Sequence, residues 1–211
     1  MDHIVYSSTT ASLPQHIIQG STVNVSDGSY YPTYNVGAYA WIISTPDGLE
    51  YISGGGVIPG TDEEQSAYRS ELGGQLGLTI FLTSIQLPDT ANPTLTIACD
   101  GKSALSKVVI NTSDVHCKDK HVDFISIISE LWNKSQLSVK KQHVYGHQDT
   151  TGRSLTRLEL LNCQMDLRAK QIARLHILSN KSNKPSTPTT LGFGIILRGK
   201  EIISSNIKKS L

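Results

Sequence analysis

The chain has 211 residues, of which 38% are hydrophobic and 18% are charged. These proportions suit one packed domain of ordinary size, and they exclude a generally disordered chain. The net charge of +1 gives no overall attraction to polyanions, so nucleic-acid binding would have to depend on a local patch. The three cysteines, an odd number without CxxC spacing, favour a reducing compartment over a disulfide framework.

The first half of the chain predicts a meander of three strands followed by a long helix. Strands are expected at residues 22–27, 36–44 and 49–58, and a helix is expected at 62–84. The Pro-Asp-Gly turn at 46–48 joins the second strand to the third as a hairpin. Gly73 and Gly77 share one face of the helix, although glycine weakens a helix interior by about 1 kcal/mol. We therefore expect that face to pack closely against a sheet.

The second half reads as alternating strands and helices. Strands are expected at residues 94–98 and 137–143, and helices at 102–109, 124–132 and 156–178, with a polar loop at 111–123. The order predicts an α/β fold in which a five-stranded mixed β-sheet is flanked by α-helices.

The chain divides by composition into a main domain, residues 1–178, and a tail, residues 179–211. The tail begins with a Ser/Asn/Pro-rich stretch typical of linkers and ends with a segment that could form a hairpin turning at 198–200. No signal-peptide pattern and no apolar run of membrane-spanning length is present. We expect a soluble, intracellular protein, in the cytoplasm or the nucleus, without a membrane partner.

Two of the predicted strands end in the same dipeptide, Asp27-Gly28 and Asp100-Gly101. If these strands are parallel neighbours, both carboxylates reach the sheet edge at which α/β proteins bind ligands. The glycines would let the backbone approach a ligand closely. Two adjacent carboxylates repel each other unless one takes up a proton or a divalent metal is bound. Each dipeptide alone could equally be a simple turn.

Three further residues could join these acids. Glu71 lies inside the first long helix (YRSELGG), Asp166 lies inside the last one (NCQMDLRAK), and His147 follows the fifth strand on a Gly-containing loop (VYGHQD). Each has an ordinary alternative, because helical acids are commonly exposed and a loop histidine is commonly solvated.

In this order, the motifs SDGS, YRSEL, ACDG, YGHQD and LNCQMD resemble the type 1 ribonuclease H family, over about residues 13–178. The residues of the motifs VSDGSY and YRSELGG are most similar to those in the ribonuclease H domains of reverse-transcribing mobile elements. The resemblance implies a ribonuclease H-like fold, and it assigns catalytic roles to Asp27, Glu71, Asp100, Asp166 and His147. The gap between the last two residues is longer than in cellular bacterial enzymes, and the loop at 111–123 is not a full basic substrate-binding protrusion.

The implied activity is hydrolysis of the RNA strand of RNA–DNA hybrids. Four hard oxygen ligands select two Mg²⁺ ions, with Mn²⁺ as a substitute. Asp27 is expected to bridge both ions, Glu71 and Asp100 to share one, and Asp166 to hold the other. His147 is expected to transfer a proton. A larger polyprotein with a reverse transcriptase domain is an expected partner.

Selectivity for RNA requires contacts to 2′-hydroxyl groups. The candidates are the backbone amides of Gly28 and Ser29 and the side chain of Arg69, which matches a family arginine two residues before Glu71; Arg69 could also form a surface salt bridge.

Two other functions stay open on the sequence alone. One is another two-metal nuclease of the same fold, such as an integrase or resolvase, which typically has fewer or differently placed acids. The other is a non-catalytic ribonuclease H-like module that positions nucleic acid beside a polymerase. The presence of all four acids and the histidine favours the hydrolase.

Overall fold

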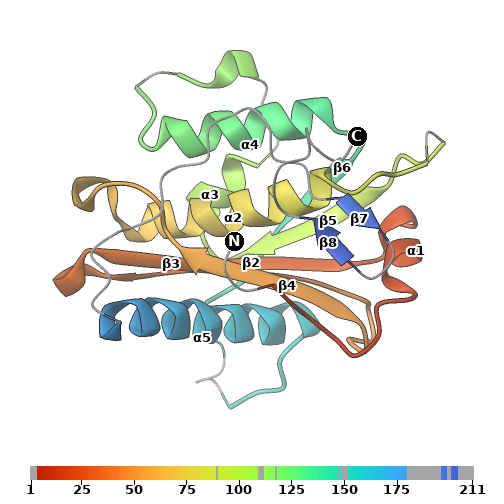
Figure 1. The fold of residues 1–211 in the computed structure, drawn as a ribbon, viewed down its shortest axis with the longest axis horizontal. Helices are drawn as coiled ribbons and strands as arrows, with labels where there is room; N and C mark the ends of the chain where they lie inside the picture. The colour runs from red at the N-terminus through yellow and green to blue at the C-terminus, as the bar shows by residue number, and fades with distance from the viewer. Residues whose placement is uncertain are drawn as a thin grey trace.

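The computed structural model describes residues 4–88, 90–108, 112–116, 118–146, 148, 152–179, 196–198 and 201–203. Figure 1 shows the order of their helices and strands. The strands are β1 (Val5–Tyr6), β2 (Val23–Tyr31), β3 (Val36–Ser44), β4 (Tyr51–Val57), β5 (Thr94–Cys99), β6 (Ser138–His143), β7 (Ile196–Arg198) and β8 (Glu201–Ile203). The α-helices are α1 (Leu13–Ile18), α2 (Ala67–Thr83), α3 (Lys102–Ser106), α4 (Val122–Lys134) and α5 (Arg157–Leu178). Short 3-10 helices are η1 (Pro32–Tyr34), η2 (Asp62–Glu64) and η3 (Thr112–Asp114).

The main sheet has six strands within the described residues, in the order β1-β4-β3-β2-β5-β6. The strands β2, β3 and β4 form the predicted antiparallel meander, whereas β5 pairs in parallel with both β2 and β6. The prediction of a mixed sheet is thus confirmed, but its count of five strands is one too low. The missing strand, β1, pairs with the edge of β4 over only two exposed residues. Two residues are too few to show an alternating pattern.

Strand β2 continues past the point at which the sequence predicts its end. Asp27 and Gly28 do not form a turn, because they pair with Ala40 and Tyr39 in the middle of the antiparallel ladder with β3. Two tyrosines that follow, with a high preference for strands, carry β2 on to Tyr31. Asp27 is therefore held on a regular strand between two neighbours.

The hairpin of β3 and β4 agrees with the prediction. β3 has the predicted bounds, and the turn closes through hydrogen bonds between the backbones of Thr45 and Glu50 and between Gly48 and Thr45. Gly48 has a φ of +79°, which a residue with a side chain rarely adopts. The glycine in this turn is thus a backbone requirement.

Helix α2 lies directly against the sheet. A Cβ atom on Gly77 would come within 2.8 Å of the Trp41 ring, and one on Gly73 would overlap Ile58. The predicted close packing of this glycine face is confirmed. The helix begins five residues later than expected, because Ser66 caps its N-terminus by accepting the N–H of Arg69 and the acidic residues before it form η2.

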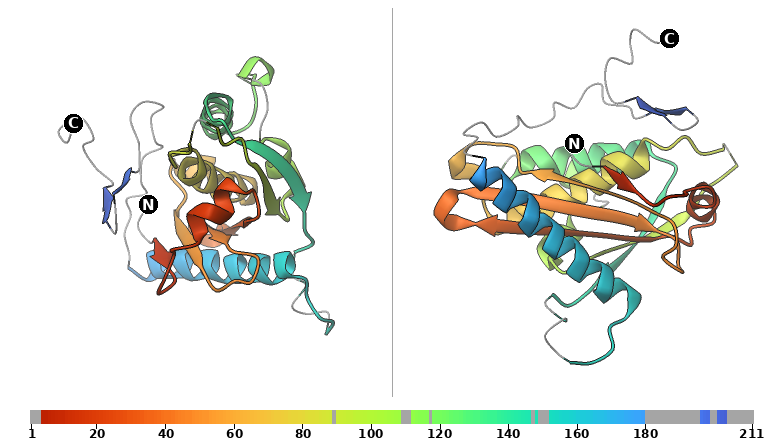
Figure 2. Two further views of the ribbon diagram at one scale, coloured as in Figure 1. Left: turned by 90° about the vertical axis from the view of Figure 1, so that its right-hand side faces the viewer. Right: turned by 60° about the horizontal axis from the view of Figure 1, so that its bottom comes forward.

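Helix α5 covers the opposite face of the sheet. Thr156 and Glu159 form a capping box at its first turn, which explains why the sequence predicts its start so closely. Figure 2 shows α5 on one side of the sheet, with α2 and α4 on the other. The largest hydrophobic cluster lies on the α2 side and includes Trp41, Phe81, Leu95 and Phe124. A smaller one lies under α5 and includes Val25, Ile42, Leu161 and Met165.

Short elements lie near both ends of the chain. The short helix α1 lies in a stretch that the sequence reads as polar, and its Leu13 and Ile17 are buried. In the tail, β7 and β8 pair antiparallel, as the predicted hairpin requires, while its linker lies outside the described residues. The division at residue 178 stays a prediction. None of the described helices is both long and apolar enough to cross a membrane.

Candidate active site

The parallel pairing of β2 and β5 brings the first two acids together. Val25 pairs with Ala98 in this register. Two residues further along both strands, the same register sets Asp27 beside Asp100. Asp27 is 3% exposed, whereas Asp100 directly follows the end of β5. The sequence-based expectation that these strands are parallel neighbours is confirmed.

Helix α2 adds Glu71 from one face of the sheet. A Cβ atom on Gly28 would overlap the backbone of Ser70 and Glu71, and one on Gly101 would lie 3.0 Å from Glu71 Cγ. The two glycines therefore let the strands and the helix approach each other. Both glycines are also partly exposed, and the expectation that they let a ligand approach the backbone closely stays a prediction.

Helix α5 adds Asp166 from the other face, together with a residue that the sequence analysis missed. Asn162 lies one turn before Asp166 and is 1% exposed. Its Nδ2 donates a hydrogen bond of 3.0 Å to Asp27 Oδ2, while the Gly28 N–H donates one of 2.7 Å to Asp27 Oδ1. Both carboxylate oxygens of Asp27 thus have a fixed donor, and the plane of the carboxylate is set.

Ionisation is strongly disfavoured at two of the four carboxylates, Asp27 and Glu71. Burial raises the pKa of Asp27 to about 10, and the charges of the other three acids add to the rise. Burial and the charge of Asp100 raise the pKa of Glu71 to about 8. Near neutral pH the cluster therefore takes up protons when it holds no cation.

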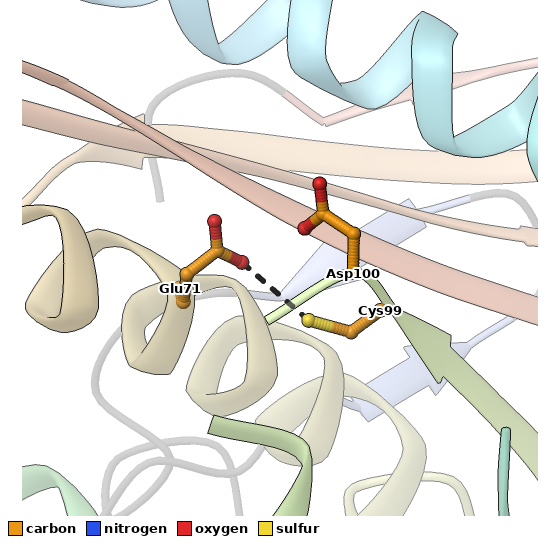
Figure 3. A group of neighbouring side chains, drawn as sticks. All are labelled: Glu71, Cys99 and Asp100. Carbon is orange, nitrogen blue, oxygen red and sulfur yellow. Dashed lines mark hydrogen bonds between the residues drawn. The ribbon is translucent and has the colours of Figure 1, made fainter. Parts of the chain in front are cut away.

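Cys99 is a second neighbour that the sequence analysis did not include. Its Sγ lies 3.4 Å from Glu71 Oε2 and donates to it (Figure 3). The possible ligand atoms of Glu71, Cys99 and Asp100 all lie within 4.8 Å of one another. Burial raises the pKa of the Cys99 thiol well above its ordinary value. A protonated thiol is a weak hydrogen-bond donor and a poor metal ligand, so oxygen remains the donor type of this site.

The cluster fits a divalent cation. It combines carboxylates that repel one another with Asn162, whose buried Oδ1 has no hydrogen-bond partner among the described residues. Hard oxygen donors of this kind suit Mg²⁺ or Mn²⁺, and a bound cation would favour the ionised carboxylates and so offset the raised pKa values.

The loop predicted to carry a catalytic histidine begins at the site. A Cβ atom on Gly146 would overlap the Asp100 carboxylate, and the His143 ring lies 3.0 Å from the Asp100 carbonyl oxygen through Nε2. On the far side, the Gln148 side chain donates to the Gly146 carbonyl oxygen. His147 itself lies outside the described residues, so its role stays a prediction.

Arg69 is not available to a substrate, and the expectation that it contacts one is wrong. Its side chain is completely buried, binds both oxygens of Asp123 at 3.0 and 2.6 Å, and lies 4.0 Å above the Phe124 ring. Two residues correspond to about 200° around a helix, so a residue two positions before Glu71 points away from the site. Arg69 instead joins α2 to α4.

Both predicted backbone contacts with substrate stay predictions. The N–H of Gly28 donates to Asp27 Oδ1 in this structure, so a contact to a 2′-hydroxyl would have to share or replace that hydrogen bond. Ser29 is partly exposed on the same strand, opposite Ala38, and its contact with substrate stays a prediction.

Comparison with solved structures identifies the fold. No family model and no curated protein matches the sequence. A foamy viral protease-reverse transcriptase in complex with RNA/DNA hybrid matches 75% of this chain and 21% of its own, with 17% identity and a TM-score of 0.50. A structure of the viral protein with dsDNA matches 75% of this chain and 97% of its own, with 15% identity and a TM-score of 0.50. The N-terminal RNase H domain of Rv2228c from Mycobacterium tuberculosis matches 76% of this chain and 100% of its own, with 14% identity and a TM-score of 0.47.

The chain has a ribonuclease H-like fold, as the order and pairing of its strands also indicate. The resemblance inferred from the motifs is confirmed at this level. The chain spans about a fifth of the hybrid-bound viral protein it matches.

Proposed function

We propose that the chain is an endoribonuclease that hydrolyses the RNA strand of RNA–DNA hybrids with two divalent cations. The observation that carries the proposal is the convergence of four carboxylates from β2, α2, α5 and the end of β5. Burial, with the charges of the other three acids adding to its effect, raises the pKa of Asp27 to about 10. Such a cluster of acids destabilises the folded protein, and clusters of this kind are typical of functional sites.

The residues present would hold the two ions as follows. Asp27 would lie between them, Glu71 and Asp100 would bind one, and Asp166 would bind the other. When bound, Mg²⁺ would supply an activated water for attack on the phosphodiester and would stabilise the leaving 3′ oxygen, with Mn²⁺ as a substitute.

The protein groups around the ions have separate tasks. The N–H of Gly28 and the amide of Asn162 hold the Asp27 carboxylate in one orientation. Asp27 and Glu71 must lose their protons before they can act as ligands, so activity should rise with pH toward neutrality. We assign proton transfer to His147, because its loop begins against Asp100.

The proposed substrate is an RNA–DNA hybrid. Support comes from the fold shared with a viral protein whose structure was determined in complex with RNA/DNA hybrid. Selection of the RNA strand requires recognition of 2′-hydroxyl groups close to the cleaved phosphate. Ser29 is the candidate for this contact, since it lies two residues beyond Asp27 on β2 and is partly exposed.

The proposed origin is a reverse-transcribing mobile element, with a reverse transcriptase domain in a larger polyprotein as the partner. The wording of the VSDGSY and YRSELGG motifs supports this origin, and so does the fold shared with a protease-reverse transcriptase. An intracellular location would agree with the proposed substrate.

A comparison of duplexes tests the proposal. The protein is incubated in Mg²⁺ with the same labelled sequence as RNA–DNA hybrid, as RNA–RNA and as DNA–DNA. We expect cleavage of the RNA strand of the hybrid and of neither other duplex. Binding of the hybrid without cleavage would instead indicate a non-catalytic module, and cleavage of DNA–DNA would indicate a nuclease of another specificity.

A further inference from the structure

The Asp166 side of the site already contains a positive charge. Lys170 lies one turn after Asp166 on α5, and its Nζ is 2.6 Å from Asp166 Oδ2. The ammonium group is therefore in direct contact with one of the four acids of the cluster.

This position conflicts with a metal ion at the same carboxylate. The ammonium occupies one of the two Asp166 oxygens that a divalent cation could bind, and two cations at one acid repel each other. The Lys170 side chain is 33% exposed and the Asp166 side chain 19% exposed, so the ammonium can move toward solvent when another cation binds. It would nevertheless stay on the same helix, one turn away.

We propose that Lys170 competes with the divalent cation at Asp166 and raises the metal concentration that the enzyme requires. The inference rests on the proposed function, in which Asp166 is a metal ligand. At a separation of about 6 Å and the dielectric constant of water, a single and a double positive charge repel by about 1.4 kcal/mol, which is about tenfold in a binding constant. The lysine would thus set the metal affinity of one half of the site.

The test replaces Lys170 by Met, which keeps the apolar stem and removes the charge. Lys134→Met is the matched control, because Lys134 forms the same type of i,i+4 ion pair with Glu130 on α4, at 2.5 Å. Mg²⁺ is titrated into each protein without substrate, and the rise of the melting temperature is followed. The Mg²⁺ dependence of hybrid cleavage is measured in parallel.

We expect Lys170→Met to reach half of both effects at about one tenth of the Mg²⁺ concentration that the wild type needs, and Lys134→Met to match the wild type. An unchanged midpoint for Lys170→Met would overturn the inference, and so would a higher one, which would mean that the lysine orients Asp166. If the wild type neither cleaves the hybrid nor gains stability with Mg²⁺, the proposed function fails as well. If the wild type shows Mg²⁺-dependent cleavage and stabilisation but Lys170→Met has an unchanged or higher midpoint, only the inference about Lys170 fails.

Discussion

Replacement of Asp27 by Asn should stabilise the metal-free protein while abolishing cleavage. In the folded protein the pKa of Asp27 is raised from 3.8 to about 10. At pH 7 the folded state therefore keeps this carboxyl protonated, whereas the unfolded state releases the proton. Folding therefore includes the uptake of a proton at a pH above the unfolded pKa, which lowers the free energy of unfolding. The neutral Asn side chain avoids this cost.

The size of the effect follows from the difference between pH 7 and the unfolded pKa of 3.8. At about 1.4 kcal/mol per pH unit, proton uptake costs the wild type about 4 kcal/mol of unfolding free energy. Part of this stabilisation is lost in the variant, because the NH₂ group of Asn must face one of the two hydrogen-bond donors, Gly28 or Asn162, at a cost of about 1–2 kcal/mol. We expect a net gain of about 2–3 kcal/mol at pH 7.

The sign of the pH dependence provides a sharper check. A carboxyl group with a raised folded pKa binds more protons in the folded state between its two pKa values, here from about 4 to about 10. Stability of the metal-free wild type should fall as pH rises through this window. The advantage of Asp27→Asn should grow by about 1.4 kcal/mol per unit between pH 5 and pH 8. Glu71, which also titrates in this range, remains in both proteins.

Urea unfolding in the presence of a chelator measures the effect, followed by the fluorescence of Trp41 and Trp132, which are both buried. The variant must also be inactive on the hybrid at saturating Mg²⁺, because it lacks a ligand charge. Parallel stability curves for the two proteins between pH 5 and pH 8 would refute the reasoning, since Asp27 would then titrate alike in the folded and unfolded states.

Three further substitutions test other parts of the structure. Arg69→Ala should destabilise the protein by about 3 kcal/mol in urea unfolding, because it leaves Asp123 without its buried partner; an unchanged stability with weaker hybrid binding would restore a substrate role for the arginine. Gly28→Ala should lower both stability and cleavage, because its Cβ would overlap the backbone of α2; full activity would mean that this contact can relax. Asn162→Ala should raise the Mg²⁺ midpoint of cleavage by about tenfold or more. Asn24→Ala is the control, because it removes a buried amide that donates to a backbone carbonyl and not to Asp27, and it should leave the Mg²⁺ midpoint unchanged. Equal midpoints for the two variants would mean that Asn162 has only a structural role.

Local signals in the sequence predicted much of the fold. The run of strand-forming residues in β3, the capping box of α5 and the glycine face of α2 each express a requirement of a single element. The Asp27-Gly28 pair misled for the same reason, since a local turn signal does not reveal that β3 pairs along its whole length. The two-residue strand β1 carries no pattern at all.

The candidate site was predictable where spacing on one element was enough. Asn162 could have been found, because it lies four residues before Asp166 and hence on the same face of the helix. The same geometry argues against Arg69, which is two residues from Glu71. Cys99 could not have been placed, because its contact with Glu71 depends on how closely α2 approaches β5. The distance between a helix and a strand depends on how their side chains pack, and a local sequence pattern does not contain this information.

The central claim is metal-dependent hydrolysis of RNA in a hybrid by the carboxylate cluster. The most direct test is a single-turnover reaction of the wild type and of Asp100→Asn in Mg²⁺, with a hybrid whose RNA strand is labelled, followed by analysis of the product ends. Attack by water with departure of the 3′ oxygen predicts fragments with 5′-phosphate and 3′-hydroxyl ends from the wild type, and no fragments from the variant. Cleavage by both proteins, or products with 2′,3′-cyclic phosphate ends, would contradict the account.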